Sequence, residues 1–328
     1  MIRIRGLSYV YALGRSREGR TALDGLDLDI AAGTMTILAG PNGSGKSTLF
    51  RLLSGLALPS RGSVEIGGFD LFAAPAQARA LLGVVFQSPA LDRHLSVEEN
   101  LSLHGALFGL RGRVLRDRIR ESLSWSGLTD RLPDRVGTLS GGLARQVELA
   151  KALMSAPSVL LLDEPTTGLD PAARRSFLEQ LARLKREREM TILMTSHVFS
   201  EAENADRVAI LSQGRLLAHD TPAALCGRLG RNVLVVNTPS EERARALLPS
   251  VAERLGHSCV LCGSEIRLEL GRDEPPVPLI DAVLDSFRDE ITGVAVREPT
   301  LDDVFVHLTG AGPGTSPFVP KPQMDLAS

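Results

Sequence analysis

A glycine-rich run lies between an apolar segment and a helical one in the first sixth of the chain. Its residues are Gly40-Pro41-Asn42-Gly43-Ser44-Gly45-Lys46-Ser47-Thr48. A strand is expected before it, over Met35–Ala39, and the helical run LFRLLSGL follows it. This strand–loop–helix context is the one in which the pattern GxxxxGK[ST] binds phosphate. Glycines let the backbone wrap closely around an anion, and the helix N-terminus adds its positive end, so we predict a nucleotide-phosphate site.

Two side chains of this run and two later carboxylates complete the expected chemistry. Lys46 should reach the β- and γ-phosphates, and the hydroxyl of Ser47 should bind Mg²⁺. The apolar run Val159–Leu162 is followed directly by Asp163 and Glu164. Asp163 is placed to hold Mg²⁺, and Glu164 is placed to orient or deprotonate the attacking water. Taken alone, two adjacent acids at a strand end are as often a solvated turn.

Composition limits the class of protein. The 328 residues are 43% hydrophobic and 23% charged, which suits a sizeable core and about two domains. A net charge of −2 argues against nucleic acid as the main partner. Three cysteines make no disulfide framework, and Cys259 and Cys262 are expected to be buried structural thiols. Without a secretory signal or an apolar run of 18 residues, we expect a cytoplasmic chain that spans no membrane.

The alternation of apolar runs and helical stretches predicts an α/β domain over residues 1–225. The strands expected in its sheet are Met35–Ala39, Gly83–Phe86, Val159–Leu162, Thr191–Thr195 and Val208–Leu211. A mostly helical block, at about 88–155, is expected as a subdomain inserted between two strands. Residues 231–311 read as βαββαβ, a small α+β domain of the split-βαβ, ferredoxin-like type. The Gly/Pro/Ser-rich residues 312–328 are expected to form a disordered tail.

Further motifs bring in a family resemblance. The segment Leu139-Ser140-Gly141-Gly142-Leu143 resembles the signature of ATP-binding cassette (ABC) ATPases. The chain also has an aromatic residue, a Q-loop, a D-loop and a switch histidine in the family's order: Tyr11, Gln87, Gly168-Leu169-Asp170 and His197. The resemblance covers roughly Ile2–Asp220 and implies the P-loop fold of ABC ATPases. Leu143 departs from the family's commonest residue, Gln, and activity is expected to survive this change.

The resemblance assigns a role to each motif. Tyr11 would stack on adenine, with Tyr9 as the alternative. Gln87 would contact Mg²⁺ or the attacking water, unless it is an ordinary loop residue, and His197 would donate a hydrogen bond to the γ-phosphate. The loop Ser140, Gly141 and Gly142, a second anion site at a helix N-terminus, would complete the site of a partner chain, with Asp170 nearby. A homodimer, or a heterodimer with a paralogue, would thus enclose two MgATP.

Two other segments resemble the multidrug and daunorubicin-resistance group of exporter ATPases. They are FQSPALDRHLSVEENLSLHGALFGL, which starts at Phe86, and EPTLDDVFVHLT, which starts at Glu298. The resemblance implies export of an unidentified substrate through separate membrane subunits, with the ATPase peripheral on the inner face of the membrane. One alternative is a soluble ABC ATPase of DNA repair or translation. A further hypothesis makes the C-terminal domain a small-molecule sensor.

Overall fold

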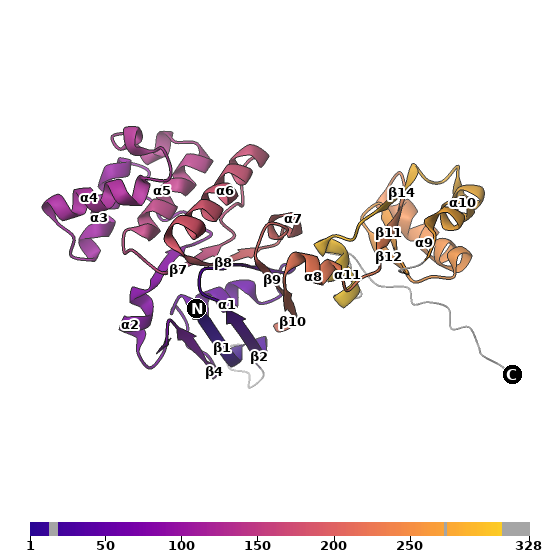
Figure 1. Cartoon of the computed structure of the whole chain (residues 1–328), viewed down its shortest axis with the longest axis horizontal. Coiled ribbons are helices and arrows are strands. Elements are labelled where there is room, and N and C mark those ends of the chain that lie inside the picture. Colours follow the sequence, from indigo (N-terminus) through magenta and orange to yellow (C-terminus); the bar gives the residue numbers. More distant parts are fainter. Residues whose placement is uncertain (13–18, 272–273, 310–328) are drawn as a thin grey trace. The chain divides into compact units, whose positions relative to one another are not determined.

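The computed structural model describes residues 1–12, 19–271 and 274–309, so the expected tail at 312–328 lies outside the described residues. The chain divides into two compact units, the first over Met1–His219 and the second starting at Asp220 (Figure 1). No helix in the described ranges has the length and apolar character needed to cross a bilayer.

A six-stranded sheet carries the phosphate loop of the first unit. Its strands, in chain order, are β3 (Met35–Ala39), β6 (Leu82–Val85), β7 (Val159–Asp163), β8 (Thr191–Ser196), β9 (Arg207–Ser212) and β10 (Arg215–Asp220). The spatial order is β10-β9-β3-β8-β7-β6, and the neighbours from β9 to β6 pair in parallel. β3 and β8 are buried along their whole length, as short apolar runs in a covered parallel sheet should be. The five strands predicted from the sequence lie within one residue of their predicted bounds, and β10 was not predicted.

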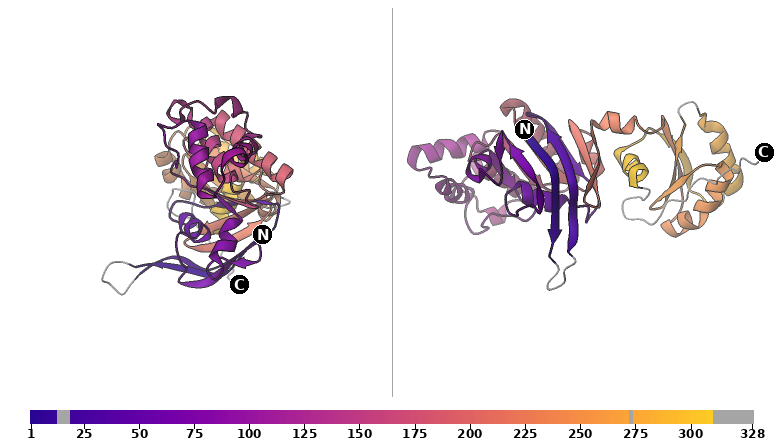
Figure 2. Two further views of the ribbon diagram at one scale, coloured as in Figure 1. Left: turned by 90° about the vertical axis from the view of Figure 1, so that its left-hand side faces the viewer. Right: turned by 90° about the horizontal axis from the view of Figure 1, so that it is seen from below.

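A second, antiparallel sheet in this unit has the order β2-β1-β4-β5. Its strands are β1 (Ile2–Tyr11), β2 (Arg20–Ile30), β4 (Arg61–Ile66) and β5 (Phe69–Asp70), and the long strands β1 and β2 run side by side in Figure 2. Helix α1 (Lys46–Leu53) contacts β2 of this sheet and β7 and β8 of the other. Apolar residues of both sheets and of α1 form one core, which fixes the phosphate loop at the start of α1.

A cluster of helices separates β6 from β7 in the chain. Helices α3 (Val97–Leu107), α4 (Gly112–Leu123) and α5 (Gly141–Leu153) contact one another (Figure 1). Ser96 caps α3 in a capping box with Glu99, which fixes where that helix begins. The segment between α4 and α5 is not α-helical and contains two 3₁₀ turns, Thr129–Arg131 and Val136–Thr138. The remaining helices of this unit are α2 (Pro75–Ala80), α6 (Pro171–Arg188) and α7 (Phe199–Ala202).

The second unit holds a four-stranded antiparallel sheet. Its elements are α8 (Pro222–Cys226), β11 (Asn232–Asn237), α9 (Glu241–Leu255), β12 (Cys259–Cys262), β13 (Glu265–Leu270), α10 (Pro276–Phe287), β14 (Gly293–Arg297) and α11 (Leu301–Thr309). The strand order is β12-β13-β11-β14, and α9 and α10 contribute to one apolar core with the strands. Helix α8 packs against α11 within this unit.

Candidate functional site

The phosphate loop has a backbone that only glycine permits at two positions. A Cβ at Gly40 would lie 2.2 Å from the carbonyl oxygen of Leu211, and one at Gly45 would lie 2.7 Å from that of Ala22. Gly45 also has a φ of +109°, in a region that L-residues rarely adopt. The loop is thus held tightly against neighbouring backbone, and α1 begins at Lys46, directly after Gly45.

A cavity of about 440 Å³ opens over this loop. Its lining residues are Tyr11, Arg20, Thr21, Ala22, Asn42, Gly43, Gly45, Lys46, Ser47, Thr48, Glu164, Gln213 and Gly214. Three residues of the loop do not line the cavity: Gly40, Pro41 and Ser44. The carbonyl oxygen of Pro41 accepts from the backbone N–H of Ser44 at 3.2 Å, and the hydroxyl of Ser44 is buried. The size of the cavity suits a nucleotide, since sites for small molecules hold about 300–1,000 Å³.

Lys46 is the buried cation of the site. It is 5% exposed, and its Nζ donates to the carbonyl oxygens of Gly40 at 2.7 Å and of Pro41 at 3.1 Å. Burial lowers the pKa of Lys46, while the nearby charges of Glu164 and Asp163 oppose this shift. The two carboxylates that the sequence singled out therefore lie close to the loop lysine.

Asp163 and Glu164 share one hydroxyl that the sequence analysis did not identify. Thr195 on β8 donates from Oγ1 to Asp163 Oδ1 at 2.7 Å, and the same Oγ1 accepts from the backbone N–H of Glu164 at 2.9 Å. Burial raises the pKa of Asp163, and the Thr195 hydrogen bond partly opposes that shift. β7 and β8 pair Asp163 with Thr195 in register, which explains how the two meet.

The carboxylate of Glu164 collects donors from three different loops. Its Oε2 lies 3.2 Å from Nδ1 of His197, 3.3 Å from Nε2 of Gln87 and 3.3 Å from Oγ1 of Thr167. The Glu164 side chain is 12% exposed and has a positive backbone φ of 42°. The structure thus brings two other predicted site residues, Gln87 and His197, to the carboxylate of Glu164, together with Thr167, which the sequence analysis did not identify.

Tyr11 rather than Tyr9 lines the cavity. The hydroxyl of Tyr11 lies 3.2 Å from Oγ1 of Thr48, while the ring of Tyr9 packs against the apolar core. The two rings contact edge to face, with centroids 4.9 Å apart. The ring of Tyr9 therefore packs against the ring of Tyr11 without lining the cavity itself.

The signature loop lies apart from this cavity. Ser140 is exposed and caps α5, with its Oγ accepting from Leu143 N at 3.4 Å, and Gly141 and Gly142 form the first turn. None of these residues is among the described residues that line the cavity. Asp170 is also outside it: its Oδ1 accepts from Ala172 N at 3.0 Å and from Ala173 N at 2.9 Å, which caps helix α6. Side-chain capping therefore accounts for the local position of Asp170.

The oxygen donors of the site suit magnesium. Ser47 and Asp163 offer a hydroxyl and a carboxylate, and Gln87 offers an amide, all of the hard type that Mg²⁺ prefers. The described part of the chain has no cluster of three or more His, Cys, Asp or Glu side chains that could cage a metal.

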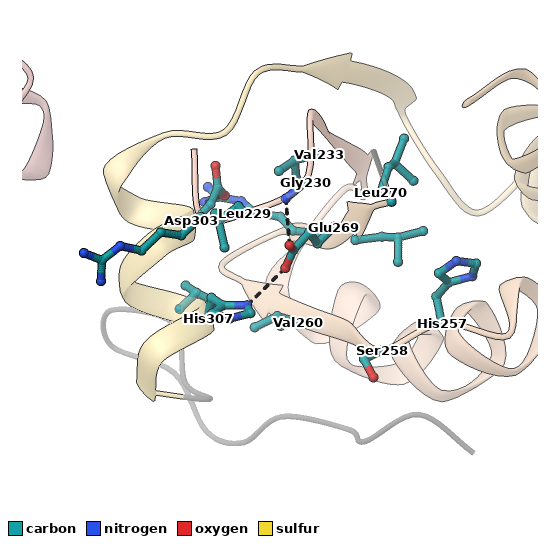
Figure 3. Close-up of a pocket in the computed structure, with 15 residues that line it drawn as sticks. Leu229, Gly230, Val233, His257, Ser258, Val260, Glu269, Leu270, Asp303 and His307 are labelled. Atoms are coloured by element: carbon teal, nitrogen blue, oxygen red, sulfur yellow. Dashed lines mark hydrogen bonds and ion pairs between the residues drawn. The ribbon is translucent and has the colours of Figure 1, made fainter. Parts of the chain in front are cut away.

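The second unit has a larger cavity of about 610 Å³ (Figure 3). Apolar side chains such as Val233 and Val260 line it together with charged ones. Glu269 points toward it between two donors, the backbone N–H of Gly230 at 2.8 Å and Nδ1 of His307 at 3.0 Å. Nothing in the sequence indicated this cavity, because its walls come from segments far apart in the chain.

Comparison with known proteins agrees with the fold and the site. The family model described as ABC transporter matches residues 23–167. A daunorubicin resistance ATP-binding protein of Streptomyces coeruleorubidus is 36% identical over 301 residues, covering 89% of this chain and 91% of that protein. Nod factor export ATP-binding protein I of Rhizobium sp. (strain N33) is 35% identical over 304 residues, covering 90% and 94%. A solved dimeric ATP-binding cassette bound to ADP and Pi is 28% identical, with a TM-score of 0.60, and is covered over 98% of its length by 67% of this chain.

The parallel sheet and its phosphate loop define a P-loop ATPase with the ATP-binding cassette fold, as the sequence predicted. Relatives above 30% identity match over almost their whole length. The chain belongs to the ABC transporter family of ATP-binding proteins. It is the ATP-hydrolysing subunit of an ABC exporter, in the group that contains the daunorubicin resistance and Nod factor export proteins, and the predicted exporter assignment is confirmed.

Proposed function

We propose that the chain hydrolyses MgATP with Glu164 as the residue that activates water. The observation that carries this proposal is the meeting of Gln87, Thr167 and His197 at one carboxylate oxygen of Glu164, beside the cavity of Lys46. A carboxylate aimed at the phosphate site can accept a proton from an attacking water or orient it. His197 would then donate to the γ-phosphate oxygens, where negative charge accumulates.

The remaining site residues bind the nucleotide in this proposal. Tyr11 stacks on adenine, because it supplies an aromatic ring in the cavity wall. The backbone from Gly40 to Thr48 surrounds the phosphates, and Lys46 exchanges its carbonyl partners for β- and γ-phosphate oxygens. Ser47 and Asp163 hold Mg²⁺, with Gln87 contacting it or the water; bound there, the ion neutralises charge on the phosphates.

The signature loop acts on a second copy in this proposal. Ser140, Gly141 and Gly142 form an exposed helix N-terminus, which favours an anion, yet they lie outside their own chain's cavity. A head-to-tail dimer lets each such loop close the other chain's site, and Asp170 sits at the same interface. The solved cassette is dimeric, which supports a dimer of this chain. The dimer partner is a second copy or a paralogue.

Export then requires separate membrane subunits, with the ATPase on the inner face of the membrane. The family and the relatives named for resistance and export favour this over a soluble ABC ATPase of DNA repair or translation. The neighbourhood of the gene discriminates between the two. An adjacent reading frame with about six apolar segments of roughly 20 residues supports transport.

The substitution Glu164→Gln tests the assignment of the base. It keeps the shape of the side chain and removes its basicity, so turnover should fall by about 100-fold or more, while nucleotide binding persists. Glu179→Gln on α6, an exposed position, is the matched control and should hydrolyse ATP at the wild-type rate. Wild-type turnover in Glu164→Gln would show that another group activates the water.

We also propose that the second unit has the ferredoxin-like split-βαβ fold and senses a small molecule. The strand order β12-β13-β11-β14 and the cavity of about 610 Å³ support this role. The lining suits a largely apolar molecule with a few hydrogen-bonding groups. Val260→Trp would fill the cavity and should change ATPase activity or transport. If both activities stay at the wild-type level, the sensor hypothesis is wrong.

A further inference from the structure

Helix α5 carries a buried ion pair outside the nucleotide cavity. Nη1 of Arg145 contacts Oε2 of Glu148 one turn along the helix, and the two side chains are only 7% and 5% exposed. Buried charges persist when their other donors and acceptors are also satisfied, because each has lost its water. The other partners of this pair therefore show what it holds in place.

The guanidinium of Arg145 donates to three backbone carbonyls. Its Nε reaches Pro165 O at 2.7 Å, its Nη1 reaches Phe86 O at 2.8 Å, and its Nη2 reaches Glu164 O at 3.4 Å. Phe86 precedes Gln87 in the chain, and Pro165 follows Glu164. Only arginine offers five N–H donors in one rigid plane, so no other side chain can make this set of contacts.

The loop that carries Gln87 is also held at its far end. Oε1 of Glu148 accepts from the backbone N–H of Ala90 at 2.6 Å. Nζ of Lys151, one turn further along α5, donates to the carbonyl oxygen of Ala90 at 2.7 Å. Helix α5 thus fixes both ends of the segment from Phe86 to Ala90.

The backbone of Glu164 needs such support. Its φ of +42° is uncommon for a residue with a side chain and persists only where neighbours enforce it. The N–H of Glu164 is held by Thr195, and its carbonyl accepts from Arg145 and from Thr167 N, the latter at 3.2 Å. Because the peptide groups on both sides are fixed, the direction of the Cα–Cβ bond from which the carboxylate extends is fixed too.

We propose that Arg145, held by Glu148, is a positioning residue for hydrolysis that ties helix α5 to the backbone of Glu164 and to the loop of Gln87. The inference rests on the proposed function of Glu164 and deepens it. α5 begins at Gly141, directly after Ser140. A displacement of the signature loop on contact with a second chain's nucleotide therefore passes through Arg145 to the carboxylate of the same chain.

The competing explanation gives the pair a purely structural role in joining α5 to the sheet. The two explanations differ in the step that a substitution affects. A positioning role predicts a loss in kcat with unchanged nucleotide affinity, whereas a structural role predicts a general loss of folded protein. They differ also in how substitutions combine, because a residue that acts through Glu164 has no further effect once that carboxylate is removed.

The first experiment compares Arg145→Gln and Arg145→Lys with Arg118→Gln. Arg118 forms an ion pair of the same spacing on α4, with Glu121 at 3.4 Å, and serves as the matched control. We expect both Arg145 variants to lower kcat roughly 10- to 100-fold, the size of effect that a misplaced catalytic group produces. Binding of a fluorescent ATP analogue should stay within about twofold of wild type, and Arg118→Gln should keep the wild-type kcat.

Arg145→Lys keeps a positive charge beside Glu148, so it guards against a variant that fails to fold. If the thermal unfolding midpoint of Arg145→Gln falls well below that of Arg118→Gln, the kcat values of Arg145→Lys and Glu148→Gln are compared with that of the control instead. An equal loss of kcat and of ATP-analogue binding in these variants, or a wild-type kcat, overturns the proposal.

The second experiment combines Arg145→Lys with Glu164→Gln and follows the slow residual hydrolysis over hours. We expect the double variant to turn over no more slowly than Glu164→Gln alone. A further loss by the factor that Arg145→Lys causes in the wild-type background overturns the proposal. Wild-type turnover in Glu164→Gln alone is a different result, because it removes the proposed role of Glu164 itself.

Discussion

The hydroxyl of Thr195 offers a sharp test of the site, because one atom serves both carboxylate residues. Thr195 is 1% exposed, and its Oγ1 donates to Asp163 and accepts from the N–H of Glu164. Thr195→Val replaces the hydroxyl by a methyl group of almost the same shape. The substitution removes both hydrogen bonds without leaving a cavity.

The magnitude follows from the two bonds. A hydrogen bond to a charged carboxylate contributes about 1.5–3 kcal/mol, and an N–H left unpaired in a buried site costs about 1–3 kcal/mol. Burial of the added methyl returns about 0.8 kcal/mol. The net local loss is therefore about 2–5 kcal/mol. Even about 1.4 kcal/mol of this, if it falls on Mg²⁺ binding, raises the Mg²⁺ requirement about tenfold.

The pH dependence has a defined sign. Burial raises the pKa of Asp163, and the bond from Thr195 lowers it in part. Loss of that bond raises the pKa further, so Asp163 becomes protonated at a higher pH than in the wild type. In the proposed mechanism Asp163 holds Mg²⁺ only when it is ionised, so the acid side of the ATPase pH profile should move toward higher pH.

The assay is ATP hydrolysis at increasing Mg²⁺, repeated from pH 5 to pH 8. Thr191→Val is the matched control: Thr191 lies on the same strand, is 2% exposed and accepts from the N–H of Gly33 at 3.0 Å, away from the carboxylates. It should lower stability and leave the Mg²⁺ and pH dependence unchanged. If Thr195→Val shows wild-type Mg²⁺ and pH dependence, the hydroxyl does not set the state of Asp163, and the reasoning fails.

Two further predictions concern the second unit. Burial opposes ionisation of Asp303, but hydrogen bonds from Arg297 and Thr300 keep its pKa below the usual value, so its contribution to stability is present at neutral pH and is lost in acid below about pH 4. Asp303→Asn should lower the free energy of unfolding of this unit by about 3–5 kcal/mol at pH 7. The difference between variant and wild type should be smaller at pH 3. Urea unfolding curves that are the same for both proteins at pH 7 would contradict this prediction. Burial raises the pKa of Cys259 to about 12, so iodoacetamide at pH 8 should label it only after unfolding, and mass spectrometry showing rapid labelling of the native chain would refute its burial.

The sequence predicted those parts of the site that are local in the chain. The phosphate loop could be found because its glycines, Lys46 and Ser47 lie in one short run that a strand precedes and a helix follows. Asp163 and Glu164 could be found because they end a fully apolar run. Five strands of the parallel sheet and the βαββαβ order of the second unit followed from periodicity in the same way, whereas β10 and the antiparallel sheet of β1, β2, β4 and β5 were not predicted.

Contacts across the fold could not be predicted. Thr195 meets Asp163 only through the register of β7 and β8, and nothing in either strand alone fixes that register. The sequence did not single out Arg145, because its partners Phe86 and Pro165 lie 59 and 20 residues away. The packing of α8 on α11 is likewise a long-range contact that no local pattern indicates.

The contacts of Glu164 have a consequence for the direction of attack. Three side-chain donors already occupy Oε2 of its carboxylate in an isolated chain. Because a carboxylate has acceptor sites on both oxygens, a water can approach Oε1 without displacing any of these donors. In the proposed mechanism, Gln87, Thr167 and His197 therefore set the side from which a water reaches the base.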